Sequence, residues 1–243
     1  MNYHWNWGIF LEPSPEGGGT YLGTLLAGTG WTLKTALCAW SLALILGSSI
    51  GVIRTLKSPA LVALGNAYVE VFRNIPLLVQ VFLWYFILPE LLPTNWGNWV
   101  KGLVNAPFYC AVLAIGFYMS SRISEQVRAG LMTLPRGQSM AALALGLTTF
   151  QAYRYILLPM AYRIILPPLS SEFLGTIKNT SVALTIGLLE ITARAHAMQE
   201  FSFQVFEAFI AAAVIYLTIN AAVVLGLQIL ERRLAIPGFS SPG

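Results

Sequence analysis

The sequence predicts an all-α membrane protein with about five transmembrane helices. Of its 243 residues, 56% are hydrophobic and only 10% are charged, whereas an ordinary globular domain has about 25% charged residues. The mean hydropathy is +0.68, and a chain of this length has too little buried core to hide so much apolar surface from water. The same composition excludes a disordered chain, which is rich in charge and poor in aromatic residues.

Apolar runs with few or no charges locate the expected spans, since a helix needs about 20 residues to cross the hydrocarbon core. These runs are 35–53, 74–89 with an extension back through 60–72, 102–121, 158–189 and 208–230. The fourth run is interrupted by five residues: Arg163, Glu172, Lys178 and the pair Pro167-Pro168. We expect this run to form a broken span that faces protein or a polar cavity, because irregular backbone is not tolerated in contact with lipid.

The positions of lysine and arginine orient the chain in the membrane. Residues 1–30 contain no Lys or Arg, whereas Arg232 and Arg233 follow the last run, and the polar segment 122–157 carries several arginines. The positive-inside rule therefore predicts that the N-terminus lies outside and the C-terminus in the cytoplasm. The net charge of +4 is then explained by cytoplasmic loops, and no nucleic-acid partner is expected.

The sequence contains no motif of a nucleotide site, a metal site or a covalent catalyst. The patterns GxxxxGK[ST], GxSxG and HExxH are all absent. Cys38 and Cys110 lie inside apolar runs, and His4 and His196 stand far apart in the sequence, so their spacing does not predict a metal site. We therefore expect neither a cofactor nor an enzymatic activity in this chain.

The polar segment between the third and fourth runs carries a pattern typical of protein docking. Met140-Ala141-Ala142 is followed by three residues and Gly146, and the segment ends with Leu158-Pro159. Small residues on a short helix permit a close approach to a partner, and a glycine can end that helix in a turn. Such a helix suits a groove on another protein.

This spacing resembles the EAA signature in the permease subunits of ATP-binding-cassette importers. In that family a short coupling helix sits in a cleft of the ATPase and transmits its closure to the spans. The resemblance implies ATPase coupling for Gly137, Met140, Ala141, Ala142, Gly146, Leu158 and Pro159. The sequence differs from the signature at its first position, because Met140 stands where the family usually has Glu.

Further stretches narrow the resemblance to polar amino acid permeases. Residues 68–80 (YVEVFRNIPLLVQ) resemble the block that opens the core of those permeases. Residues 30–33 resemble the start of their first helix, and 177–181 resemble a later K-[DN]-[ST]-[SA] block. Because these matches occur in order along most of the chain, it is similar to glutamate/aspartate permeases of the histidine/glutamate/glutamine group.

The resemblance implies a type I importer core in the bacterial inner membrane. It divides the chain into a periplasmic segment (1–30), a permease domain (31–231) with a cytoplasmic loop (122–159), and a cytoplasmic tail (232–243). The implied partners are ATP-binding-cassette ATPase subunits, a second permease subunit (a paralogue or a copy of this chain), a periplasmic substrate-binding protein and membrane lipid.

Two pairs of opposite charges are spaced i,i+3 and so share a helix face. They are Glu70 with Arg73 and Glu125 with Arg128. Mutual neutralisation near the inner interface is the interpretation that we favour for both pairs. Contact with a substrate is the alternative.

Arg122 differs from those charges because no acid precedes it by one helical turn. The family usually has an uncharged residue at this place, and a guanidinium can bind a carboxylate through two hydrogen bonds. Arg122 is therefore a candidate for binding an anionic substrate. The alternatives are that it snorkels to the inner interface or pairs with Glu125.

The stretch Lys178-Asn179-Thr180-Ser181 is a second candidate substrate contact. Many relatives have Asp beside the lysine, and the amide of Asn179 removes that negative charge. Thr180 and Ser181 could donate hydrogen bonds to a carboxylate, although hydroxyls in membrane helices more often bond their own backbone.

These observations predict a permease subunit that imports acidic amino acids, L-glutamate or L-aspartate, using ATP hydrolysed on a partner chain. One alternative is a permease for other polar amino acids, such as glutamine or asparagine, or one of broad specificity. Another is an ATP-independent secondary transporter. Such carriers usually have two repeated halves, and the sequence has no convincing internal repeat.

Overall fold

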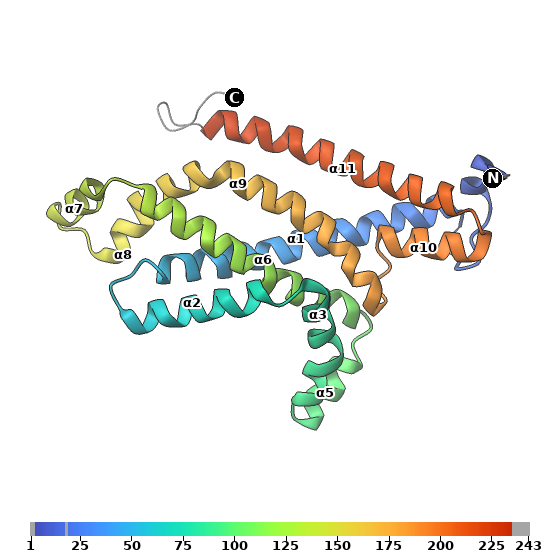
Figure 1. The fold of residues 1–243 in the computed structure, drawn as a ribbon, viewed down its shortest axis with the longest axis horizontal. Coiled ribbons are helices and arrows are strands. Elements are labelled where there is room, and N and C mark those ends of the chain that lie inside the picture. Colours follow the sequence, from blue (N-terminus) through green and yellow to red (C-terminus); the bar gives the residue numbers. More distant parts are fainter. Residues whose placement is uncertain (1–2, 18, 235–243) are drawn as a thin grey trace. The chain divides into compact units, whose positions relative to one another are not determined.

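The computed structural model describes residues 3–17 and 19–234, and the regular elements in this part of the chain are helices (Figure 1). The all-α prediction is confirmed. The chain divides into two compact units, each described by itself. Unit 1 comprises 1–40, 76–116 and 175–222, and unit 2 comprises 41–75, 117–174 and 223–243.

Three helices of the described chain are long and apolar enough to cross a membrane. They are α1 (Tyr21–Ile53), α6 (Ala106–Thr133) and α11 (Val205–Leu234). A fourth span arises if α2 (Pro59–Asn74) and the run 77–91 count as one. The helix in the expected fourth run, α9 (Leu158–Asn179), is not among them, although its 22 residues correspond to about 33 Å. The count of five spans stays a prediction.

Shorter elements connect these helices. In unit 1 they are η1 (Trp7–Leu11), α3 (Leu77–Phe82), η2 (Leu83–Ile87), α4 (Leu88–Leu91), α5 (Thr94–Lys101), η4 (Thr180–Ile186) and α10 (Ile191–Ser202). In unit 2 they are α7 (Arg136–Ala144), α8 (Thr149–Ala152) and η3 (Tyr153–Leu157).

Two local expectations were wrong. The beginning of the segment 122–157, expected as a polar loop, is helical, because α6 continues to Thr133 and ends just before Pro135. Proline disfavours the helical conformation of the residue before it. In addition, α9 continues through Pro167-Pro168, since proline is tolerated in membrane helices where neighbouring groups satisfy the freed backbone. The regular α-helix ends instead at Asn179, where η4 begins.

Prolines explain two π-helical turns. The π-helical turns η2 and η3 end at Ile87 and Leu157, two residues before Pro89 and Pro159 respectively. A proline lacks the N–H that would bond four residues back, and its ring crowds that carbonyl. A wider π turn accommodates both constraints without ending the helix.

Buried carboxylates fix the starts of two helices in unit 1. Glu190 caps α10: its side chain accepts hydrogen bonds from the Ala193 backbone N–H at 2.8 Å and the Tyr216 hydroxyl at 2.7 Å. Burial raises the pKa of the Glu190 carboxyl. Glu207, in the first turn of α11, accepts from the Asn6 backbone N–H at 2.7 Å and from the Tyr3 hydroxyl. Glu207 therefore ties the N-terminal segment to α11.

The parts of α1 and α6 in unit 2 are in close contact at two glycines. A Cβ at Gly47 would lie 2.7 Å from the Ser120 carbonyl oxygen, and one at Gly51 would lie 2.7 Å from Cβ of Val127. The two glycines form a GxxxG pattern, which lets membrane helices approach closely. This contact holds the segment of α6 that carries the charged residues described below.

We predict that Gly51→Val destabilises the protein, because the added side chain overlaps α6 and overpacking costs about 1–3 kcal/mol. The control is Gly30→Val in the same helix, where a Cβ meets open space and the change in helix propensity is the same. Thermal unfolding followed by circular dichroism in detergent should show a midpoint several degrees lower for Gly51→Val alone. Equal midpoints would argue against a close contact.

Candidate functional site

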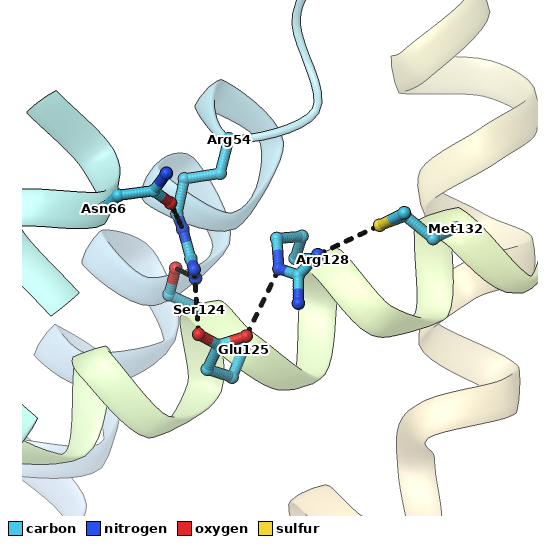
Figure 2. Close-up of polar contacts among 6 residues, drawn as sticks. All are labelled: Arg54, Asn66, Ser124, Glu125, Arg128 and Met132. Carbon is cyan, nitrogen blue, oxygen red and sulfur yellow. Dashed lines mark hydrogen bonds and ion pairs between the residues drawn. The ribbon is translucent and has the colours of Figure 1, made fainter. Parts of the chain in front are cut away.

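Arg54 is the centre of a polar network in unit 2 that joins α1, α2 and α6 (Figure 2). It follows the last residue of α1, and its side chain is only 7% exposed. Its Nε donates to Oδ1 of Asn66 at 2.7 Å, Nη1 to Oγ of Ser124 at 3.3 Å, and Nη2 to Oε1 of Glu125 at 2.8 Å. Gly65 makes room for this side chain, since a Cβ there would lie 2.5 Å from Cγ of Arg54.

Glu125 accepts from two arginines, which point at its carboxylate from different elements (Figure 2). Arg128 Nε donates to Oε2 at 3.2 Å, so the expected i,i+3 ion pair is present. Arg128 Nη1 also contacts Sδ of Met132 at 3.0 Å. The shorter ion pair, to Arg54, could not be predicted from spacing along one helix.

The second expected i,i+3 pair does not form. Glu70 and Arg73 are both exposed on α2, and the described structure has no ion pair between them. Holding two long side chains in one geometry costs conformational entropy. The weak attraction between two exposed charges often does not compensate for this cost. Their mutual neutralisation near the inner interface stays a prediction.

Arg122 forms an ion pair that spans two helices of unit 2. Its Nε donates to Oε2 of Glu172 at 2.7 Å and its Nη2 to Oε1 at 3.0 Å. The Arg122 side chain, on α6, is 45% exposed, whereas the Glu172 side chain, on α9, is 12% exposed. The alternative that Arg122 pairs with Glu125 was wrong, because Glu125 is engaged by Arg54 and Arg128.

The stretch from Lys178 to Ser181 belongs to unit 1 and is described apart from Arg122. Lys178, near the end of α9, is exposed. The buried Thr180 hydroxyl donates to the Ile177 carbonyl at 2.8 Å, and Ser181 donates to the Lys178 carbonyl at 2.8 Å. Both hydroxyl protons are therefore used on the local backbone, which favours a structural role for them, while their oxygens can still accept.

The short helix α7 is the expected docking element. It ends before Gly146, which has a φ of +80°, and the amides of Gly146 and Leu147 bond to the carbonyls of Leu143 and Ala142. This is the glycine-terminated helix end that the sequence predicts. Ala142 is buried, whereas Met140 is 64% exposed.

Other large apolar side chains around α7 are also exposed: Leu143, Leu145 and Phe150. Exposed apolar side chains close together in the sequence, these three and Met140, are typical of a protein-docking site. Within residues 3–17 and 19–234, no three His, Cys, Asp or Glu side chains are grouped as metal ligands would be.

A family model described as "Binding-protein-dependent transport system inner membrane component" matches residues 43–236. The chain belongs to this family. It is therefore an inner-membrane component of a binding-protein-dependent transport system, without a catalytic role of its own. The matched range includes the Arg54 network, the Arg122–Glu172 pair and α7.

Individual relatives narrow the comparison. The glutamate/aspartate import permease protein GltJ of Escherichia coli strain K12 is 45% identical over 98% of each chain. The probable glutamine permease protein GlnM of Bacillus subtilis is 34% identical over 84% of this chain and 89% of its own. The crystal structure of an amino acid ABC transporter with histidines has a TM-score of 0.73 at 30% identity, covering 88% of this chain and 95% of that one. The predicted importer permease fold is confirmed.

We predict that Arg54→Met lowers the free energy of unfolding by about 2–3 kcal/mol, because it removes charge-assisted hydrogen bonds to Glu125, Asn66 and Ser124. Arg128→Met should cost less than about 1 kcal/mol, since that ion pair is half-exposed and lies within one helix. Denaturant titration of the two variants in detergent measures the difference. Equal losses would contradict the central place of Arg54.

Proposed function

We propose that the chain is the permease subunit of an ATP-driven importer that carries acidic amino acids, L-glutamate and L-aspartate, across the inner membrane. The observation that carries this proposal is the 45% identity to a glutamate/aspartate permease over 98% of each chain. The match extends over almost the whole length of both chains, so it is not confined to the short family motifs.

The position of Arg122 supports the proposal that the substrate is an acidic amino acid. A charged side chain in a membrane helix is costly unless it faces a partner or a polar cavity, and Arg122 is almost half exposed in the single chain. A guanidinium at the edge of a polar path can bind a carboxylate. We propose Lys178, Asn179, Thr180 and Ser181 as further substrate contacts, on the basis of the exposed ammonium of Lys178 and the uncharged amide beside it.

The exposed apolar side chains around α7 support coupling to an ATPase. We propose that α7 docks into the ATPase, and that Met140 supplies an apolar contact where the family usually has an acid. The proposed coupling residues are Gly137, Met140, Ala141, Ala142, Gly146, Leu158 and Pro159.

We further propose an assembly with a second permease subunit, a paralogue or a copy, to enclose the path. The exposed charges of Glu70 and Arg73 on α2 support this, because charged side chains in a membrane protein require a polar environment or a partner. The binding protein would deliver substrate from the periplasm, where segment 1–30 lies. The tail 232–243 would be cytoplasmic, and its part from 235 onward is outside the described residues.

The likeness to a probable glutamine permease favours one alternative, a permease for glutamine, asparagine or a broader set of polar amino acids. Uptake by the complete transporter in proteoliposomes separates the two substrate classes. We expect labelled L-glutamate uptake that requires ATP and is competed by aspartate but not by glutamine. Uptake without ATP would instead indicate the less favoured secondary transporter.

We predict that Arg122→Ala lowers glutamate-stimulated ATP hydrolysis by about tenfold or more, as expected for the loss of a charge-assisted contact to substrate. The control is Lys101→Ala, which removes a cation that forms an exposed ion pair with Glu90 and should have little effect. Equal, small effects of both changes would remove Arg122 from the substrate path.

We predict that Gly146→Val reduces glutamate uptake per ATP hydrolysed. A β-branched residue at a φ of +80° costs about 1–2 kcal/mol, which displaces the end of α7. Gly146→Asn is the matched control, because asparagine tolerates the left-handed conformation. If both variants keep normal uptake per ATP, the end of α7 does not take part in coupling.

A further inference from the structure

The Arg122–Glu172 ion pair uses one edge of the guanidinium. Glu172 accepts from Nε and Nη2, at 2.7 and 3.0 Å. A guanidinium has a second edge, Nη1 and Nη2, that presents two parallel N–H groups to another planar carboxylate. The hydrogen-bonding geometry of Arg122 therefore allows two carboxylates to bind it at once. Tyr118, one turn earlier on α6, also interacts with this side chain.

The two members of the pair differ in exposure. Glu172 is 12% exposed and Arg122 is 45% exposed, so the carboxylate lies on the protein side and the guanidinium on the open side. An arginine on a membrane helix whose open side met lipid would be costly. The open side of Arg122 is therefore expected to face a polar path, a partner or the inner interface, and we argue for the polar path.

We propose that Glu172 is a positioning residue for substrate selection: it holds Arg122 by the Nε/Nη2 edge so that the other edge binds the side-chain carboxylate of an acidic amino acid. This inference rests on the proposed function and deepens it. Without Glu172 the long arginine side chain has several rotamers of similar energy, and ordering it would oppose substrate binding.

The carboxylate of Glu172 also limits the charge of the site. Arg122 and Glu172 together are neutral, so the pair does not trap an anion by net charge. A substrate carboxylate must instead match the hydrogen-bonding geometry of the Nη1/Nη2 edge. A transporter has to release its substrate. A contact that depends on geometry rather than on an uncompensated charge permits binding and release.

The first experiment exchanges the two charges. The double variant Arg122→Glu with Glu172→Arg keeps an ion pair between α6 and α9 but moves the guanidinium onto α9. We expect its thermal midpoint to return close to that of the wild type, above that of Arg122→Ala, while ATP-dependent glutamate uptake by the full transporter stays about tenfold or more below wild type. Restored uptake would overturn the proposal, because the pair would then serve only to join the helices.

A second experiment tests the positioning role without depending on the charge exchange. Glu172→Gln keeps an acceptor oxygen of similar reach but removes the charge. Equilibrium dialysis measures the binding of labelled L-glutamate to the purified permease–ATPase complex. The complexes compared are the wild type, Glu172→Gln, Arg122→Ala, and a variant that combines Glu172→Gln with Arg122→Ala. We expect a rise in Kd of about tenfold for Glu172→Gln, and no additional rise when it is combined with Arg122→Ala.

Independent, additive rises in Kd would show that Glu172 does not act through Arg122, and an unchanged Kd for Glu172→Gln would overturn the proposal. If the wild-type complex neither binds nor transports glutamate, the proposed function fails and the inference falls with it. That outcome is distinct from a failure of the variants alone, in which wild-type uptake is intact and only the role of Glu172 is rejected.

Discussion

The close contact between α1 and α6 at Gly47 and Gly51 is the constraint on which the charged residues of unit 2 depend. Lipid tails give helices little hydrophobic reason to associate, so close packing and hydrogen bonds between helices must supply the attraction. The glycines bring the backbone of α1 to Ser120 and Val127, and at the end of α1 they place Arg54 beside Glu125 at 2.8 Å. Packing and ion pairing therefore stabilise the same helix pair.

The charges of α6 follow from helix geometry. Arg122, Glu125 and Arg128 are three residues apart, and each step of three turns the side chain about 300°, or 60° backwards. Arg122 pairs with Glu172 on α9, whereas Glu125, one step on, pairs with Arg128 on the same helix and with Arg54 at the end of α1. One helix therefore has polar contacts on two sides.

Much of the fold could be predicted because it depends on local chemistry. Runs without charge locate α1, α6 and α11, and Gly146 ends α7. The partner of Arg122 could not be predicted, because Glu172 is 50 residues away and only the packing of α6 against α9 brings it close. For the same reason spacing predicted a Glu70–Arg73 pair that the single chain lacks, and missed the pair between Arg54 and Glu125.

The two helices that form the Arg122–Glu172 pair also flank α7, the short helix that we propose to dock on the ATPase. After Arg122, α6 runs as regular helix to Thr133 and is followed by Pro135 and α7, while α9 begins at Leu158 directly after the π turn η3. A regular helix transmits a displacement along its axis, whereas a π turn is a local irregularity that is often found at functional sites. α7 is therefore joined to the helix of Arg122 across Leu134-Pro135, and to the helix of Glu172 through α8 and η3. A movement of α7 that displaced these two connections unequally would change the separation of Arg122 and Glu172.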